Sequence, residues 1–273
     1  MASYSILFLD VDGTLLDSQH RISPDTRALL SKLHRRGIPV VLASARPPKG
    51  LAPIYDQLGF EDPAICCAGS LAVLPDQHIL YDHGIPAATA VRFEQAVLDG
   101  WPRLALSAYL YDAWLTPAPE HPAIRREAEI TGCVPLASPL GTEAQRLGDV
   151  HKLLCIGPER DITDLQQRLA PQFPELTVLR SNPTYLEVVA KGVCKEQTAA
   201  ALLQHFGLTA DRAVACGDGE VDAGMLRMAG LGVAMGNASP GVRAAADFVT
   251  ATNDAEGVFV ALNRLRFNPP PRK

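Results

Sequence analysis

The stretch ILFLDVDGTLLDS, residues 6–18, begins as a strand and ends in a group of acidic side chains. Residues 6–9 are a continuous apolar run, which is typical of a parallel strand buried on both faces. Asp10 and Asp12 lie two positions apart, and on an extended segment such side chains point to the same side. Two carboxylates about 5–7 Å apart repel each other unless a cation lies between them. The ordinary alternative is a strand followed by a polar turn, in which aspartate serves as a turn residue.

The composition is that of an ordinary soluble globular protein with ample material for a core. Its 273 residues suit one large domain or two modest ones. Hydrophobic residues make up 47%, charged residues 20%, and the net charge is −5. The slight acidity and the lack of a Lys/Arg run argue against nucleic acid as a partner. No segment has the apolar length of a membrane span, and the N-terminus lacks the pattern of a signal peptide, so we expect no membrane partner.

The six cysteines are scattered, and most lie in apolar runs. They form no CxxC pair, so the sequence contains no zinc or redox motif. We interpret them as reduced, mostly buried thiols of a cytoplasmic protein. They are Cys66, Cys67, Cys133, Cys155, Cys194 and Cys216.

Strand and helix patterns alternate in the first 70 residues. Ser23 has the position of a helix N-cap, with Pro24 at the first helical position and Gly37 at the end. Apolar runs at residues 38–43 and 63–68 predict the second and third strands. This βαβαβ order predicts an α/β fold with a doubly wound parallel sheet.

The pattern changes near Asp82. Residues 71–81 indicate a hairpin, and from about residue 83 to 190 we expect a separate α+β unit with an antiparallel sheet. The α/β pattern returns at residue 191, so one domain is inserted into another: 1–82 and 191–273 form the core domain and 83–190 the insert. The insert has predicted helices at 86–99, 121–131 and 161–171 and strands at 103–110, 151–156, 176–181 and 184–190. The returning core has helices at 191–207, 239–246 and 254–265, one helix between its first two strands, and strands at 212–217, 231–236 and 247–250.

Four polar groups fall where predicted core strands end, or at the start of an adjoining helix. In an open parallel sheet, ligands bind at this edge. Taken singly, each group has an ordinary explanation as an N-cap, a solvated helix residue or a turn. Their shared placement instead predicts a functional site. The groups are Asp10 with Asp12, Ser44 with Arg46, Lys195, and Asp218 with Asp222.

The segments around these groups resemble the motifs of one enzyme superfamily. DVDGTLLDS, LASAR, GVCKEQTAAALL and GDGEVDAGML are similar, in this order, to the four motifs of the haloacid dehalogenase (HAD) superfamily phosphatases. MGNASPGVRAAADFVTATNDAEGV also resembles the C-terminal stretch of these proteins, so the likeness covers nearly the whole chain. More narrowly, the chain resembles the Cof-type subfamily IIB, whose large cap of type C2B follows the third core strand. The resemblance implies a Rossmann-like HAD core and a cap formed by the insert.

The resemblance also implies catalytic and metal-binding roles. Asp10 matches a nucleophile that forms an aspartyl-phosphate, and Asp12 matches the general acid and base. Several carboxylates around a phosphate dianion require a cation, and Mg²⁺ prefers carboxylate oxygens. Asp10, the backbone carbonyl of Asp12, and Asp218 match the family's metal ligands. Asp222 matches an acid that supports the metal site through its outer shell.

Further residues are candidates for contacts with the substrate. Ser44 matches a hydrogen-bond donor to phosphate, and Lys195 matches the cation that neutralises the phosphoryl oxygens and the nucleophile. Arg46 would reach phosphate or the cap side, or form a surface ion pair. Asn237 would support the phosphate site, or serve as a turn residue. In the cap, Arg180 and Tyr185 flank a predicted hairpin and are the main candidates. The other candidates are Tyr109, Tyr111, Trp114, Arg125 and Arg126, and aromatic residues of this kind more often belong to a domain's own core.

Three positions depart from the family pattern. Val221 stands where the fourth motif has Asn, Ala45 where the second motif has Gly, and Ala68 where an Asn is common after the third strand. Two amides that could bind phosphate or the metal shell are therefore missing. Loss of one such hydrogen bond typically lowers metal affinity or activity about 10–100-fold.

Together these features predict a Mg²⁺-dependent phosphomonoesterase that hydrolyses small phosphorylated metabolites, such as sugar phosphates or cofactor phosphates, through an aspartyl-phosphate. One alternative is a phosphometabolite-binding or regulatory protein with weakened catalysis, which the three departures favour. Another is a phosphomutase on the same scaffold. The fold alone does not separate these functions, and the sequence predicts no oligomeric state.

Overall fold

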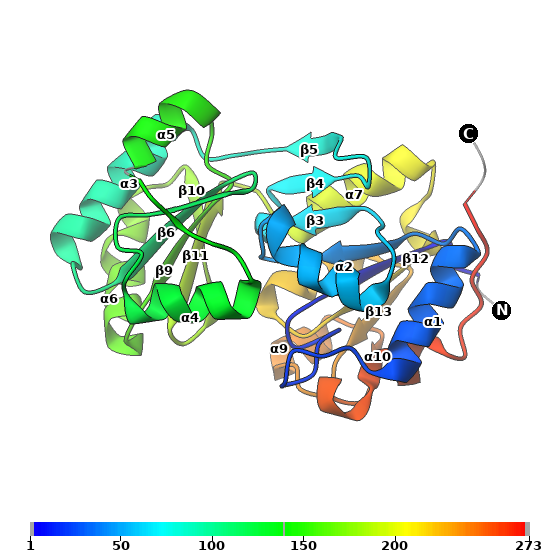
Figure 1. Cartoon of the computed structure of the whole chain (residues 1–273). Coiled ribbons are helices and arrows are strands. Elements are labelled where there is room, and N and C mark those ends of the chain that lie inside the picture. The colour runs from blue at the N-terminus through cyan, green and yellow to red at the C-terminus, as the bar shows by residue number, and fades with distance from the viewer. Residues whose placement is uncertain (1–2, 139, 271–273) are drawn as a thin grey trace. The chain divides into compact units, whose positions relative to one another are not determined.

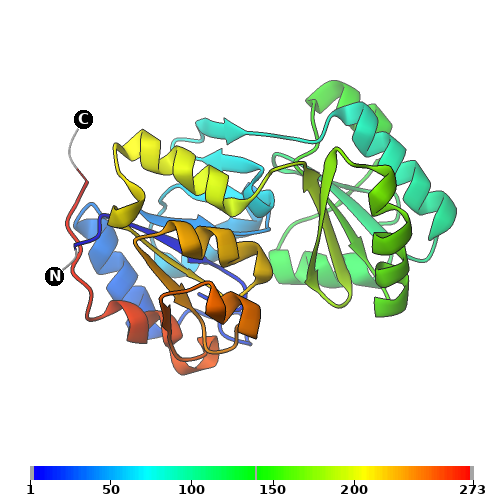
Figure 2. The same cartoon turned by 180° about the vertical axis from the view of Figure 1, so that it is seen from behind.

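A computed structural model describes residues 3–138 and 140–270 (Figures 1 and 2). The chain divides into two compact units. The core unit consists of Met1–Ala45, Ala52–Tyr81 and Cys194–Lys273, and the cap unit consists of Arg46–Leu51 and Asp82–Val193.

The core unit is built on an eight-stranded sheet in the order β14-β13-β12-β1-β2-β3-β4-β5. β1 (Ile6–Asp10) lies inside this sheet and pairs in parallel with β12 on one side and β2 on the other. All five residues of β1 are buried, as its continuous apolar run predicted. The pairings from β14 to β3 are parallel, whereas β3 and β4 pair antiparallel. The remaining bounds are β2 (Val40–Ala43), β3 (Ala64–Cys66), β4 (Leu71–Val73), β5 (Ile79–Asp82), β12 (Ala213–Gly217), β13 (Leu231–Ala234) and β14 (Phe248–Val249).

Helices cover both faces of the core sheet, which confirms the doubly wound α/β prediction. α1, α2 and α10 lie in front of the sheet in Figure 1, and α7 and α8 lie in front in the reverse view of Figure 2. On the α7 and α8 face, Ile6 and Phe8 of β1 pack into one buried cluster with Leu202 and Met225. The bounds are α1 (Pro24–Arg35), α2 (Ala52–Leu58), α7 (Lys195–Phe206), α8 (Ala223–Met228), α9 (Pro240–Ala244) and α10 (Gly257–Leu262).

The first helix begins where the sequence predicted. The Ser23 hydroxyl accepts a hydrogen bond from the Thr26 N–H at 3.2 Å, and Pro24 occupies the first helical position. The local capping pattern therefore determines this boundary without help from distant residues.

The cap unit has a six-stranded sheet in the order β10-β11-β9-β6-β7-β8. Its first four pairings are antiparallel, and only β7 and β8 run parallel, so the predicted α+β insert is confirmed. The strands are β6 (Ala105–Leu110), β7 (Ala113–Thr116), β8 (Leu136–Ala137), β9 (Lys152–Ile156), β10 (Leu176–Asn182) and β11 (Tyr185–Ala190). The helices are α3 (Ala87–Gly100), α4 (Pro122–Thr131), α5 (Leu140–Leu147) and α6 (Glu159–Arg168).

The sequence missed three elements of the cap unit: β7, β8 and α5. β7 follows a two-residue turn in which Tyr111 has a φ of +52°, and such a turn has no Gly or Asn signal here. β8 is only two residues long. These two short strands depend on pairing with the neighbouring strands, which local periodicity does not reveal.

The segment Arg46–Leu51 lies in the cap unit, outside the predicted insert of residues 83–190. The Arg46 guanidinium donates to the Ile130 carbonyl at 3.3 Å, and the Lys49 N–H donates to the Asp112 carboxylate at 3.1 Å. Contacts across more than 60 positions of sequence are not visible in a local pattern. The domain bounds 1–82 with 191–273 and 83–190 stay predictions.

All six cysteines are free thiols, and four of them are buried. No helix within residues 3–138 or 140–270 combines the length and the apolar character that crossing a bilayer requires.

Candidate active site

The carboxyl ends of three adjacent core strands bring the predicted site residues to one edge of the sheet. Asp10 is the last residue of β1 and lies in register with Ala43, the last residue of β2, so Ser44 comes next. β12 ends at Gly217, and Asp218 follows. The strand order reverses at β1, because β2 lies on one side of it and β12 on the other. In open parallel sheets, ligands bind beside the carboxyl ends of the strands at such a reversal.

Lys195 joins two of the aspartates. It is the first residue of α7 and is 1% exposed. Its ammonium donates to the Asp10 carboxylate at 2.6 Å and to the Asp222 carboxylate at 2.7 Å. Burial by itself lowers the pKa of Lys195, but the charges of Asp10 and Asp222 outweigh it and raise the pKa above its usual value. The ammonium is therefore charged at neutral pH.

The site carries more negative than positive charge. Carboxylate oxygens of Asp10, Asp218 and Asp222 all lie within 4.8 Å of one another, and one ammonium cannot balance three carboxylates. Burial, and then the charge of Asp222, raise the pKa of Asp10 well above its usual value, although Lys195 opposes them. Burial raises the pKa of Asp218 as well. When its three carboxylates are ionised, the cluster therefore carries more negative charge than the Lys195 ammonium balances.

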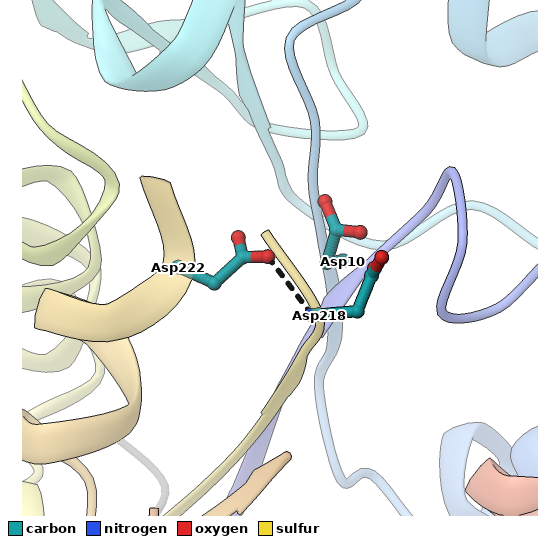
Figure 3. A group of neighbouring side chains, drawn as sticks. All are labelled: Asp10, Asp218 and Asp222. Carbon is teal, nitrogen blue, oxygen red and sulfur yellow. Dashed lines mark hydrogen bonds between the residues drawn. The ribbon is translucent and has the colours of Figure 1, made fainter. Parts of the chain in front are cut away.

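Asp222 organises the loop after β12. One of its oxygens accepts a hydrogen bond from the Lys195 ammonium. The other accepts hydrogen bonds from the N–H groups of Asp218 and Gly219, at 3.1 and 2.9 Å. Figure 3 shows the bond from the Asp218 N–H to the Asp222 carboxylate, with Asp10 and Asp218 side by side. Because both of its oxygens are engaged, Asp222 is better suited to orient the site than to bind a metal ion directly.

Asp218 is held by Asn237, which the sequence predicted for the site, and by Thr14, to which the sequence interpretation gave no role. The Thr14 hydroxyl donates to one of its oxygens at 2.7 Å, and the Asn237 amide donates to the other at 3.2 Å and to the Gly13 carbonyl at 2.8 Å. Gly13 has a φ of +85°, and a Cβ there would lie 2.5 Å from the Asp218 carboxylate. The DGT signal in the first motif could have identified Thr14, since a hydroxyl beside a carboxylate is a natural orienting group.

Asp12 and Ser44 differ sharply in exposure. The Asp12 side chain is exposed beyond the end of β1, where the alternation of a strand no longer applies, and it forms no part of the three-aspartate cluster. Ser44 is 1% exposed; its N–H donates to the Ile65 carbonyl at 2.8 Å, and its carbonyl accepts the Ala68 N–H at 3.1 Å.

The two arginine candidates belong to the cap unit. Arg46 is buried and donates to the carbonyls of Gly50 and Ile130, both at 3.3 Å. Arg180 of β10 donates to the Thr163 hydroxyl at 3.2 Å and to the Pro183 carbonyl at 2.7 Å. Both guanidiniums therefore have structural partners inside that unit, and their contacts with substrate stay predictions.

The three departures from the motif pattern occupy distinct surroundings. Ala68 is buried with a φ of +59°, a conformation in which Asn or Gly is more usual. Val221 is half-buried in the short 3₁₀ turn Glu220–Asp222, and Ala45 is half-buried beside Ser44. None of these side chains offers a hydrogen-bond donor.

The donor set of the acidic cluster fits a magnesium ion. Its ligand atoms are all carboxylate oxygens, which Mg²⁺ prefers, and the excess negative charge needs a compact cation. Asp10 and Asp218 would hold the ion, with Asp222 in support.

Comparison with known proteins agrees with this geometry. A profile of the haloacid dehalogenase-like hydrolases matches residues 7–262. A Haemophilus influenzae protein classed with the phosphatases is 33% identical over 259 residues, which span 95% of this chain and 97% of that protein. The HMP-PP phosphatase of Escherichia coli is 30% identical over 237 residues, 86% of this chain and 85% of that one. A solved sugar phosphatase of HAD subclass IIB superposes with a TM-score of 0.80 at 27% identity, over 95% of this chain and 98% of that one. The chain therefore belongs to the haloacid dehalogenase-like hydrolase family, as an enzyme of its phosphatase type.

Proposed function

We propose that this protein is a Mg²⁺-dependent phosphomonoesterase that hydrolyses a small phosphorylated metabolite, with a sugar or a cofactor-like alcohol as its leaving group. The observation that carries the proposal is the cluster of Asp10, Asp218, Asp222 and Lys195 at the end of β1. Relatives named as a sugar phosphatase and as an HMP-PP phosphatase support the substrate class.

Asp10 is the proposed nucleophile. One of its oxygens attacks the phosphorus atom, and the bond from phosphorus to the leaving oxygen breaks with its electron pair. Asp12, in its protonated form, transfers a proton to that oxygen, so the product leaves as a neutral alcohol. Asp12 then takes a proton from water, which attacks the aspartyl-phosphate and releases inorganic phosphate. The exposed position of Asp12 suits an exchange of protons with solvent.

Lys195 and Ser44 would stabilise the charge that develops on the phosphoryl oxygens. The Lys195 ammonium already lies 2.6 Å from the nucleophile, so it also restrains the attacking carboxylate. Asp10 and Asp218 would hold a magnesium ion, which would supply the remaining positive charge. Asn237 would act through Asp218, and Arg46 and Arg180 are proposed to bind the organic part of the substrate.

A second candidate function is ligand binding with weakened turnover. Ala68 and Val221 favour this function, because each stands where the motif pattern has an asparagine, and neither side chain carries an amide.

A cytoplasmic location remains a prediction from the sequence.

The test is phosphate release from a panel of phosphorylated metabolites, with and without Mg²⁺, by the wild-type protein and by Asp10→Asn. We expect activity that requires Mg²⁺ and disappears in Asp10→Asn. Asp56→Asn is the matched control, because it neutralises an exposed aspartate of α2 in the same unit and should retain activity. No release by folded wild-type protein, combined with thermal stabilisation by a phosphorylated ligand, would favour the binding protein instead.

A further inference from the structure

The loop between β3 and β4 adopts an unusual backbone conformation. Cys67, Ala68 and Gly69, here named the bridging loop, have φ angles of +50°, +59° and +107° in succession. Residues with a Cβ rarely adopt positive φ, and each instance costs about 1–2 kcal/mol. Such strain persists only where the surroundings impose it, which is most often near functional sites.

One side of the bridging loop contacts the strand end that carries Ser44. The Ala68 N–H donates to the Ser44 carbonyl at 3.1 Å, directly beyond the pairing of β2 with β3. This bond uses only the backbone of Ala68, so it does not depend on the missing amide side chain. The position of the loop and the position of Ser44 are therefore coupled.

The other side of the bridging loop contacts the start of the helix that carries Lys195. A Cβ on Gly69 would lie 2.5 Å from the carbonyl carbon of Cys194 and 2.7 Å from the nitrogen of Lys195, so only glycine permits this approach. The buried Thr198 hydroxyl donates to the Gly69 carbonyl at 2.5 Å. Cys194 provides no side-chain cap for α7, and the Thr198 hydroxyl also donates to the Cys194 carbonyl at 3.3 Å. Thr198 thus connects the first turn of the helix to the loop.

We propose that the bridging loop sets the spacing between Ser44 and Lys195, and that Thr198 is the positioning residue that locks Lys195 in place through Gly69. The inference rests on the proposed phosphatase function, in which both residues bind phosphoryl oxygens. Thr198 would not touch the substrate. It would act through the first turn of α7, which carries Lys195. A displacement of about 1 Å at a group that acts on the substrate can lower the rate about 100-fold.

The test compares two substitutions at Thr198. Thr198→Val keeps the shape of the side chain and removes its hydroxyl, whereas Thr198→Ser keeps the hydroxyl. We expect Thr198→Val to lower kcat about 10–100-fold, and to lose most of the rise in Tm that inorganic phosphate with Mg²⁺ produces in the wild type. Thr198→Ser should restore both properties to near the wild-type values.

Thr250→Val is the matched control. The Thr250 hydroxyl is also buried and also donates to a glycine carbonyl of the core unit, that of Gly257 at 2.8 Å. Its loss should lower the Tm in the absence of ligand about as much as Thr198→Val does, while kcat and the phosphate-induced rise in Tm stay unchanged. If Thr198→Val does not fold, Thr198→Ala replaces it, because alanine favours the helix.

Two results would overturn the inference. One is a Thr198→Val protein with wild-type kcat and a wild-type response to phosphate. The other is equal losses of kcat and response in Thr198→Val and Thr250→Val, which would indicate general destabilisation. If the wild type hydrolyses no phosphorylated compound, the proposed function fails, and the response of Tm to phosphate in the two threonine variants still decides the positioning role.

Discussion

At the scale of single residues, Lys195 dominates the electrostatics of the site. Its ammonium is the shared partner of Asp10 and Asp222, and all three side chains are buried or nearly so. Removal of one member of a buried ionic group leaves its partners desolvated and unpaired, which is more costly than never burying them. The catalytic arrangement and the stability of the core unit therefore depend on the same side chain.

We expect Lys195→Met to lower the free energy of unfolding by about 3–5 kcal/mol at pH 8 in EDTA. The difference in stability between Lys195→Met and the wild type should shrink as the pH falls, because protonation removes the charge of the buried Asp10 that Lys195 otherwise balances. The pKa of Asp10 is raised in the folded protein, so proton uptake by Asp10 stabilises the folded state at low pH. That stabilisation is lost as the pH rises through the pKa of Asp10 in the folded protein. Urea denaturation between pH 5 and pH 8 measures both effects.

Lys32→Met is the control for this prediction, because Lys32 is an exposed residue of α1. Its free energy of unfolding should stay within about 0.5 kcal/mol of the wild type. Equal losses in the two variants, or a loss at Lys195 that does not vary with pH, would contradict the charge argument.

At the scale of elements, the turn between β4 and β5 contains a non-glycine residue with a left-handed backbone conformation. Gln77 is exposed and has a φ of +67°, where a glycine avoids the contact between Cβ and the backbone. Its N–H donates to the Leu74 carbonyl at 2.9 Å, so the turn is closed in this conformation. A glycine at position 77 therefore fits the backbone conformation that this turn already has.

Gln77→Gly should raise the free energy of unfolding by about 1 kcal/mol, less the extra entropy of glycine in the unfolded chain. Chemical denaturation of the wild type, Gln77→Gly and Gln77→Ala would measure it. The alanine variant retains a Cβ and should show no gain. A gain in Gln77→Ala equal to that in Gln77→Gly would mean that the left-handed strain is not the cause.

At the scale of the whole molecule, the chain contains two units with separate cores. The three aspartates of the acidic cluster all belong to the core unit. In the cap unit, Phe93 of α3 is 1% exposed and meets Phe173 edge-on, with ring centroids 5.2 Å apart. Binding of a metal ion should thus stabilise the unit that holds its ligands, and a cavity in the cap unit should weaken the other.

Hydrogen exchange followed by mass spectrometry tests this separation. Mg²⁺ should slow exchange in β1 and β12 of both the wild type and Phe93→Ala. Phe93→Ala, which removes about 3–5 kcal/mol of packing, should speed exchange in β9 and β11, and Mg²⁺ should not restore it. Asp218→Asn serves as the control that removes the response of the core unit to Mg²⁺. Protection of the cap strands by Mg²⁺ in Phe93→Ala would show that the two units do not open separately.

Local patterns sufficed for the α/β core, its inserted α+β unit and the helix start at Ser23. Buried parallel strands require apolar runs, and a helix start requires a capping group within three residues, so both leave a trace in neighbouring positions. The short strands β7 and β8 leave no such trace, since two to four residues stabilised by pairing carry no periodicity.

For the site, the sequence by itself determined which polar residues lie at or just after the ends of the core strands, because parallel strands align their carboxyl ends at one edge. Only the tertiary structure decided their partners. Lys195 lies 185 positions from Asp10 and 27 from Asp222, and Thr14 lies 204 positions from Asp218. Whether such side chains meet depends on how α7 packs against the sheet and on the backbone of the bridging loop. Those are long-range packing outcomes, and no spacing within a motif encodes them.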